Sequence, residues 1–371
     1  MLFILKWLLY SIAIFFLILI IALFLLLKFV PAFGAKPSSK EKKSYKKSPN
    51  YQSGKFINLQ PLRTAYKGPD FIEDSIQDAA LRKPHFELPI QNIEPHHFND
   101  KSTTTQVFWM GHSTLFIKIE GLNIWIDPMF SRSPSPLSFV GRPRYRRQLP
   151  FKIDDIDTID AVLLTHDHYD HLDYSSIKAI KERVQHFYCP LGMQAHLQRW
   201  GVSESKITCL DWHDSVQLQN LQLILTPSHH YTGRSLNDRF ESLWGGWVLK
   251  GSQDNLYISG DGGYGPHFRA IGAQYGPFDL AMIECGQYCK YWINNHLFPE
   301  QTAQVGLDVG AKVLMPIHWG AFTLAFHAWD APVERLITRA SAFNLPICTP
   351  LIGQVVDVSS KQFPQKKWWR T

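Results

Sequence analysis

THDHYDHLD, residues 165–173, places three histidines and three aspartates in nine positions, directly after the apolar run of residues 161–164. A short apolar run followed by a polar stretch is typical of a buried strand and its loop. Such a loop needs no function, but imidazole and carboxylate groups are the ligands that Zn²⁺ and similar divalent cations prefer. Because the spacing is so specific, the segment predicts a metal site at the C-terminal end of a strand.

The spacing H-x-H-x-D-H divides the ligands of this loop between two centres. His166 and His168 can direct their imidazoles to one cation, while Asp170 and His171 face another. Two cations about 3.5–4 Å apart generate a hydroxide at neutral pH and stabilise a displacement at phosphorus or at a carbonyl carbon. Four ligands from one loop cannot saturate two cations and leave room for water. Other segments must therefore supply further ligands.

Ligand-type residues also follow later predicted strands. His230, Asp261 and His318 each come a few residues after such a strand, as His166 does. Binding sites are usually built from loops on a rigid scaffold, so we expect these side chains to converge. The small neighbours of Asp261 in the segment SGDG would let its carboxylate bridge two cations. His229 is adjacent to His230, and the residues alone leave open which of the two is the ligand.

The chain begins with strands and continues with alternating strands and helices, which indicates an α/β fold of two packed sheets with helices outside. Strands are predicted over residues 106–110, 114–119, 123–126, 161–164, 221–225, 246–249, 256–258, 280–284 and 313–316. Helices are predicted over residues 174–184, 191–200, 299–310 and 331–343. Residues 61–100 show weak periodicity and several prolines, so we expect an irregular path there.

Other polar residues near these motifs have simpler interpretations. Asp127 is expected to hold its loop by hydrogen bonding rather than to bind metal. Cys285-x3-Cys289 has a metal-ligand spacing, but no second cysteine pair accompanies it. The isolated histidines are interpreted as ordinary core or surface residues; these are His186, His196, His213 and His327.

An uncharged apolar run over residues 7–27 precedes this domain. About 20 helical residues cross the hydrocarbon core of a membrane, whereas the apolar part of a signal peptide has roughly 7–15. The run therefore predicts an uncleaved transmembrane anchor, although Phe33-Gly34-Ala35 would allow cleavage. Lys28 and the lysines of residues 36–47 follow the run, so the positive-inside rule places the rest of the chain in the cytoplasm.

These features divide the chain into a transmembrane anchor (residues 1–28), a basic linker (29–60) and a catalytic domain (61–371). Hydrophobic residues make up 45% of the 371 residues, which excludes general disorder. Five scattered cysteines give no disulfide framework, which suits a reducing compartment.

Two basic segments have several interpretations. The four arginines within residues 142–147 are too few for a nucleic-acid surface. Anionic phospholipid head groups or plain solvent are the alternatives for them. The C-terminal segment 366–370 combines cations with indoles, which suits a membrane interface or a tail without a role.

Taken together, the motifs resemble those of the metallo-β-lactamase superfamily, and within it the branch of N-acylphosphatidylethanolamine-hydrolysing phospholipase D. The similar segments are Trp109–Thr114, Asp127–Ser131, Arg144–Arg147, Thr165–Asp173, Thr226–Tyr231, Leu243–Trp247, Gly260–Tyr264 and Ile317–Gly320. The resemblance implies an αββα metallo-β-lactamase sandwich, here preceded by one N-terminal transmembrane helix that is not part of the family domain.

The resemblance also implies two divalent metal ions, taken as Zn²⁺. The first would be held by His166, His168 and His230, and the second by Asp170, His171 and His318, with Asp261 bridging. The family pattern Pro-Ser-x-His selects His230 over His229. His296 matches a family histidine beside the scissile phosphate, so the catalytic roles fall to Asp170, Asp261 and His296. Mammalian members carry Gln where this chain has Asn295. The match is also loose around residues 285–292, so the resemblance does not define the head-group and acyl-chain selectivity.

Three classes of function are compatible with these motifs. The favoured one is a membrane-anchored dinuclear zinc phosphodiesterase of phospholipase D type. It would hydrolyse N-acylphosphatidylethanolamine-like phospholipids to phosphatidic acid and N-acylethanolamine through a metal-bound hydroxide. The alternatives are a hydrolase of the same fold acting on soluble lactones or nucleotide phosphodiesters, which needs no anchor, and a non-catalytic module, which would have lost a ligand. The expected partners are membrane phospholipid and an anionic lipid surface, not nucleic acid, and a homo-oligomer is compatible with the sequence.

Overall fold

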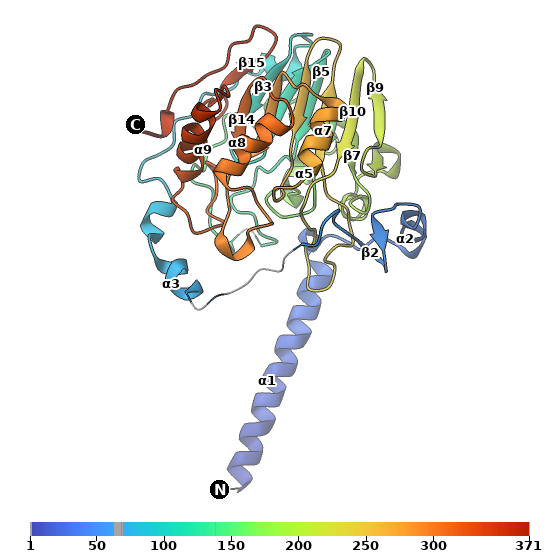
Figure 1. Ribbon diagram of the computed structural model, residues 1–371. Coiled ribbons are helices and arrows are strands. Elements are labelled where there is room, and N and C mark those ends of the chain that lie inside the picture. Colours follow the sequence, from blue (N-terminus) through green and yellow to red (C-terminus); the bar gives the residue numbers. More distant parts are fainter. Residues whose placement is uncertain (1, 63–67, 69, 138, 371) are drawn as a thin grey trace.

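The computed structural model describes residues 2–62, 68, 70–137 and 139–370. In this part of the chain, two large β-sheets pack face to face, helices cover their outer faces, and the long helix α1 (Leu2–Phe29) leaves the domain at one end (Figure 1). The αββα sandwich predicted from the sequence is confirmed.

The first sheet has the strand order β15-β3-β4-β5-β6-β7-β8. Its strands are β3 (Gln106–Trp109), β4 (Leu115–Ile119), β5 (Leu122–Ile126), β6 (Ile159–Leu163), β7 (Val184–Pro190), β8 (Ile207–Leu210) and β15 (Val355–Asp357). β3, β4 and β5 pair antiparallel, whereas β5 to β8 run parallel. The loops after β5 and β6 therefore leave the sheet at the same edge.

The second sheet has the order β14-β13-β12-β11-β10-β9. Its strands are β9 (Ser215–Leu218), β10 (Leu221–Thr226), β11 (Gly246–Lys250), β12 (Asn255–Ile258), β13 (Leu280–Glu284) and β14 (Leu314–Ile317). β12, β13 and β14 run parallel, so their carboxyl ends also meet at one edge.

Apolar side chains fill the space between the sheets and the space beneath the helices. On β4, Ile117 points into the inter-sheet core while its neighbour Phe116 points under the outer helices, as the two-residue period of a strand requires. The helices on the first sheet are α5 (Tyr174–Ile180) and α6 (Gln194–Arg199). Those on the second are α7 (His267–Tyr275), α8 (Pro299–Asp308) and α9 (Ala331–Ala342). Both faces of each sheet are thus buried, which explains the near-continuous apolar runs.

Each predicted strand and helix is present, although several ends shift by a few residues. β7, β8, β9, β15 and α7 are not predicted from the sequence. Polar residues interrupt the apolar runs of β7 and α7, and β9 alternates exposed with half-buried positions. The irregular path expected for residues 61–100 is seen in its described part, where α3 (Phe71–Ile76) and α4 (His96–Asn99) are short. Residues 63–67 and 69 lie outside the described residues.

The segment 29–60, predicted as a basic linker, has ordered structure and packs on the domain. It contains the 3-10 helix η1 (Pro31–Phe33), α2 (Ser39–Tyr45) and the hairpin of β1 (Tyr51–Gln52) and β2 (Lys55–Phe56). Tyr45 and Phe56 are buried in the inter-sheet core, and Lys42 and Lys55 pair with Glu241 at 3.0 and 3.3 Å. The lysine-rich composition hides these aromatic anchors, so a linker is the wrong description of this part.

The C-terminal tryptophans match neither alternative given for residues 366–370, a membrane interface or a tail without a role. Trp368 and Trp369 are buried, and Trp368 stacks on Trp319 with ring centroids 5.4 Å apart. Trp109 also stacks on Trp319, at 5.4 Å, and its ring centroid lies 6.2 Å from that of Trp368. Burial of an aromatic side chain outweighs the interfacial preference of indole, so this segment closes the core.

The layered core makes a direct prediction about stability. Ile117→Ala removes a fully buried side chain between the sheets and should cost about 2–5 kcal/mol of unfolding free energy. Ile72→Ala is the matched control, because Ile72 on α3 is 74% exposed and should change the same quantity by less than about 0.5 kcal/mol. Denaturant unfolding of the full chain in detergent measures both, and equal losses would contradict the assigned core.

Candidate metal centre

The loops after β6, β10, β12, β13 and β14 meet at one edge of the sandwich and surround a cavity of about 310 Å³. The cavity is lined by His168, Asp170, Tyr231, Asp261, Gln287, Trp292, Asn295, His296, His318 and Leu324. Both sheets contribute, the first through the loop of residues 165–173 and the second through the others. The ligand-type residues predicted from separate strand ends are therefore brought together.

Three imidazoles form one group at this edge. His168 Nδ1 lies 3.0 Å from His166 Nε2 and 3.2 Å from His230 Nε2. The second ring nitrogen of His230 faces the Asn295 carbonyl at 3.0 Å, and that of His166 faces the Thr165 hydroxyl at 3.0 Å. Protein groups thus bind the outer nitrogens and leave the inner ones facing one another, which is how metal-binding imidazoles are usually held.

A second group lies beside the first and shares Asp261 with it. His171 Nε2 is 3.1 Å and His166 Nε2 is 3.8 Å from Asp261 Oδ2, while His318 Nδ1 is 3.0 Å from Asp261 Oδ1. Asp170 Oδ2 lies 3.5 Å from His171 Nε2. Asp261 therefore contacts histidines of both groups, His166 and His171 through Oδ2 and His318 through Oδ1.

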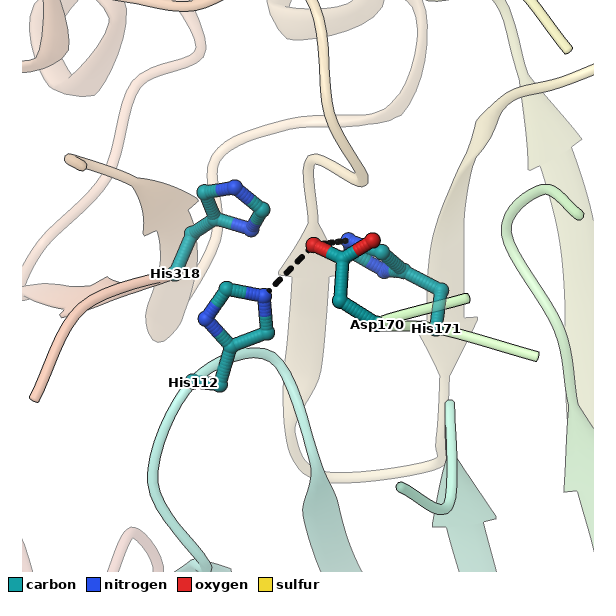
Figure 2. A group of neighbouring side chains, drawn as sticks. All are labelled: His112, Asp170, His171 and His318. Carbon is teal, nitrogen blue, oxygen red and sulfur yellow. Dashed lines mark hydrogen bonds and ion pairs between the residues drawn. The ribbon is translucent and has the colours of Figure 1, made fainter. Parts of the chain in front are cut away.

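His112 completes the second group and was missed by sequence reasoning. Its Nε2 lies 2.8 Å from Asp170 Oδ2, and Figure 2 shows the ring beside His318, facing Asp170 and His171 across the gap. Backbone hydrogen bonds join its loop to the loop of His318, from His112 to Trp319 at 2.9 Å and from His318 to His112 at 2.8 Å. Gly111-His112 looks like an ordinary turn between strands, so only the fold reveals this contact.

Asp127 holds the loop of residues 165–173 from behind by hydrogen bonding, as predicted. Its carboxylate accepts from the Thr165 amide at 2.8 Å and hydroxyl at 2.5 Å, and from His171 Nδ1–H at 2.7 Å. This fixes the tautomer of His171 and leaves its Nε2 for the cluster. Asp127, His112 and His318 all have positive φ, at 42°, 56° and 65°. Such backbone is costly for these residues and is typical of functional sites.

The electrostatics of the cluster fit bound cations. Burial, with the neighbouring imidazoles, lowers the pKa of His166 and His230 well below the ordinary value, so both rings are neutral. Burial raises the pKa of Asp261, but His171 and His318 outweigh it and hold that pKa well below the usual range. Neutral imidazoles and ionised carboxylates are the forms that ligate metal.

Several buried polar atoms here also lack hydrogen-bond partners within the described part of the chain. They are His112 Nδ1, His318 Nε2, His171 Nε2 and Asp261 Oδ1, of which the last two have only ion-pair contacts, at 3.1 and 3.5 Å for His171 Nε2 and at 3.0 Å for Asp261 Oδ1. Buried polar atoms normally have hydrogen-bond partners. A group of buried nitrogen and oxygen atoms without such partners therefore indicates that a ligand binds there. The donor set suits divalent cations of the zinc type.

His296 lies at the cavity beside these groups and is held by Glu284, a second residue that the sequence analysis missed. Glu284 Oε2 lies 2.8 Å from His296 Nδ1, while Oε1 accepts from the amides of Gly262 at 2.7 Å and Leu297 at 3.2 Å. Burial and the charge of Asp261 raise the pKa of Glu284, and burial lowers that of His296. Both shifts favour the neutral pair, in which Glu284 donates to Nδ1 and the ring proton lies on Nε2.

The remaining alternatives lie outside the cluster. The ring of His229 is buried beside the site without belonging to the candidate metal groups of the described residues. Cys285 donates its thiol to the Pro332 carbonyl at 3.4 Å inside the outer core, and Cys289 lines a different cavity. The spacing of these two cysteines therefore reflects packing and not a shared ligand.

Comparisons with known proteins agree with this geometry. A family model described as the beta-lactamase superfamily domain matches residues 122–319. The chain is 36% identical over 334 residues to the uncharacterized protein Rv0906 of Mycobacterium tuberculosis, covering 87% of this chain and 88% of that one. It is 32% identical over 291 residues to the N-acyl-phosphatidylethanolamine-hydrolyzing phospholipase D 1 of Caenorhabditis elegans, covering 74% and 81%.

Among solved structures, the isothiocyanate hydrolase from Delia radicum gut bacteria has the same fold, with a TM-score of 0.55. The two chains are 19% identical, and the match covers 68% of this chain and 98% of that one.

The His112–Asp170 contact predicts a specific metal-binding defect. His112→Ala removes the partner that orients Asp170 and should weaken one of the bound metals roughly 10–100-fold, as loss of such outer partners usually does. Competition with a chelator of known affinity measures this. His229→Ala is the control, a neighbouring buried histidine outside the cluster, and should keep the parent affinity. An unchanged His112→Ala protein would show that the contact does not orient a ligand.

Proposed function

This chain belongs to the metallo-β-lactamase superfamily and is a metal-dependent hydrolase, and on that premise we propose that it is a phospholipase D. In this proposal it hydrolyses N-acylphosphatidylethanolamine-like phospholipids to phosphatidic acid and N-acylethanolamine, using two zinc ions. Relatives that carry this activity in their names, 32% and 28% identical, support the substrate class.

The observation that carries the proposal is the pair of ligand groups that share Asp261 at the cavity. We assign His166, His168 and His230 to one ion, and Asp170, His171 and His318 to the other, with Asp261 between them. The supporting contacts are those of Asp261 with His166 of the first group, at 3.8 Å, and with His171 and His318 of the second, at 3.1 and 3.0 Å. Two cations held in this way are the usual arrangement for displacement at a phosphodiester.

Bound cations would activate water and neutralise charge on the phosphoryl oxygens. The chain's own residues then orient the diester and stabilise it. His296 donates from Nε2–H to a phosphoryl oxygen, because its Nδ1 is bound to Glu284. Tyr231, Trp292 and Leu324 supply the less polar wall of the cavity, which suits the part of a lipid next to the phosphate.

We further propose that the enzyme is a single-pass membrane protein with residues after 28 in the cytoplasm. Phe3–Phe29 is long and apolar enough to cross a membrane, and at 1.5 Å per residue α1 spans about 42 Å. The lysine-rich segment that follows supports the cytoplasmic orientation. In this division of the chain, residues 1–28 anchor and residues 61–371 catalyse.

The metal assignment predicts that two adjacent histidines behave differently. His230→Ala should lower bound zinc and abolish turnover, because it removes a ligand, whereas His229→Ala should retain both. Metal analysis of the purified full chain and a phospholipid panel, scored for phosphatidic acid and released head group, measure these outcomes. Equal metal content and activity in both variants would refute the ligand set. A soluble lactone or nucleotide hydrolysed far faster than any phospholipid would refute the substrate.

The neutral Glu284–His296 pair predicts a second contrast. His296→Ala should lower kcat/KM by about 10²–10³ at unchanged metal content, since a donor to developing charge is lost. Glu284→Gln should stay near the parent rate, because an amide reproduces both the acceptor for the two backbone amides and the donor to Nδ1. Glu284→Leu should lose rate as His296→Ala does. Loss of activity in Glu284→Gln would show that this carboxyl acts ionised.

A further inference from the structure

The short turn between the apolar helix and the domain, residues 31–35, contacts the domain through its backbone. Trp200 donates from Nε1 to the Pro31 carbonyl at 2.7 Å. Arg199 donates to the carbonyl of Gly34 and to that of Lys28, the latter at 2.7 Å. We call residues 31–35 the juxtamembrane turn. Because these partners lie on α6 and just after it, the turn is fixed to a helix of the catalytic domain.

Arg234 joins this turn to the metal-binding loop. Its Nε and Nη2 donate to the Ala32 carbonyl at 3.1 and 2.8 Å, while Nη1 donates to the carbonyls of Asp167 at 2.5 Å and Leu172 at 2.7 Å. The two loop carbonyls enclose the ligand positions 168, 170 and 171. The guanidinium is 4.1 Å from the Tyr169 ring centroid, and the residue is only 4% exposed.

A second path runs in parallel through His196. The Ala35 amide donates to His196 Nδ1 at 3.0 Å, so the ring proton lies on Nε2, which faces Asp167 Oδ2 at 3.3 Å. Asp167 also accepts from the Gly233 amide at 2.8 Å and the Ser242 hydroxyl at 2.6 Å. Asp167 lies between two ligand histidines of the loop, and His196 is one of those interpreted from the sequence as ordinary.

We propose that the juxtamembrane turn is a positioning element of the metal centre, acting through Arg234 and His196 on the loop of residues 165–173. A buried guanidinium needs all its donors bound, and without the Ala32 carbonyl Arg234 would turn toward water and release the loop. The inference rests on the proposed ligand roles in that loop, but not on the identity of the substrate.

The same contacts bear on processing of the N-terminus. Cleavage after Ala35, which the sequence alone would allow, would remove the acceptor of Arg234 and the donor to His196 together. Cleavage before Pro31 would spare both. The structure therefore assigns residues 31–35 to the working enzyme and not to a removable leader.

Gly34 allows a test in the full-length protein in detergent. It has φ +69°, and a Cβ there would lie 1.9 Å from His196 Nδ1, so Gly34→Val must displace the turn from His196. Gly54→Val is the matched control, since Gly54 has φ +83° with nothing within 4 Å of an added Cβ. Gly34→Val should weaken zinc binding roughly tenfold or more relative to Gly54→Val. It should also alter the visible spectrum of the cobalt-substituted protein, which a purely structural role would leave unchanged.

Arg199→Gln gives a second test on an exposed side chain, in case Gly34→Val fails to fold. It releases the Gly34 and Lys28 carbonyls without touching the loop and should weaken zinc binding in the same direction. Zinc affinity and cobalt spectra equal to the control in every folded variant would overturn the proposal. Weakened zinc binding in an enzyme that hydrolyses no phospholipid would uphold the turn's role and refute only the proposed substrate.

Discussion

The structure depends on charge compensation at a buried point. Among the described residues, seven imidazoles, the carboxylates of Asp170 and Asp261 and the carboxyl of Glu284 crowd the edge of the sandwich, where unpaired polar atoms are costly. Burial alone would drive the carboxylates toward neutrality, and the histidines hold them ionised instead. Without a cation, the same carboxylates outweigh burial and raise the pKa of His171 well above its ordinary value. The carboxylates therefore favour positive charge at this point, and a bound divalent cation would supply it.

This constraint explains why the candidate ligands come from both sheets. A single loop supplies neighbouring side chains on one side of a cation, whereas closure around it needs residues from the facing layer. The sandwich provides this because the parallel strands of both sheets end at the same edge. Asp127 and His112 then hold individual ligands from outside the cluster, in backbone that is strained for their residue types. The cost of that strain is met by the packing around them.

The sequence pattern predicted the elements of the fold that a local run of apolar residues marks. The strands whose faces are both buried, such as β4, β6 and β13, appear as apolar runs, and the candidate ligands follow the ends of β6, β10, β12 and β14. His112 and Glu284 could not be found in this way, because their roles depend on partners 58 and 12 residues away that only folding brings close. The juxtamembrane turn acts through backbone carbonyls, which leave no trace in side-chain composition. In the sequence, Trp368 and Trp369 resemble residues of a membrane interface, because composition alone does not show that the folded domain buries them.

The stack of Trp109, Trp319 and Trp368 gives the molecule an internal optical reporter. Trp319 follows His318 directly in the chain, and Trp109 donates from Nε1 to the His112 carbonyl at 2.7 Å. Two of the stacked indoles are therefore fixed to the backbone of cluster histidines on neighbouring loops. Any rearrangement of those loops changes the overlap of the rings, and with it their near-ultraviolet circular dichroism. A rearrangement of these loops can thus be followed by the protein's own aromatic signal, without a label or a substrate.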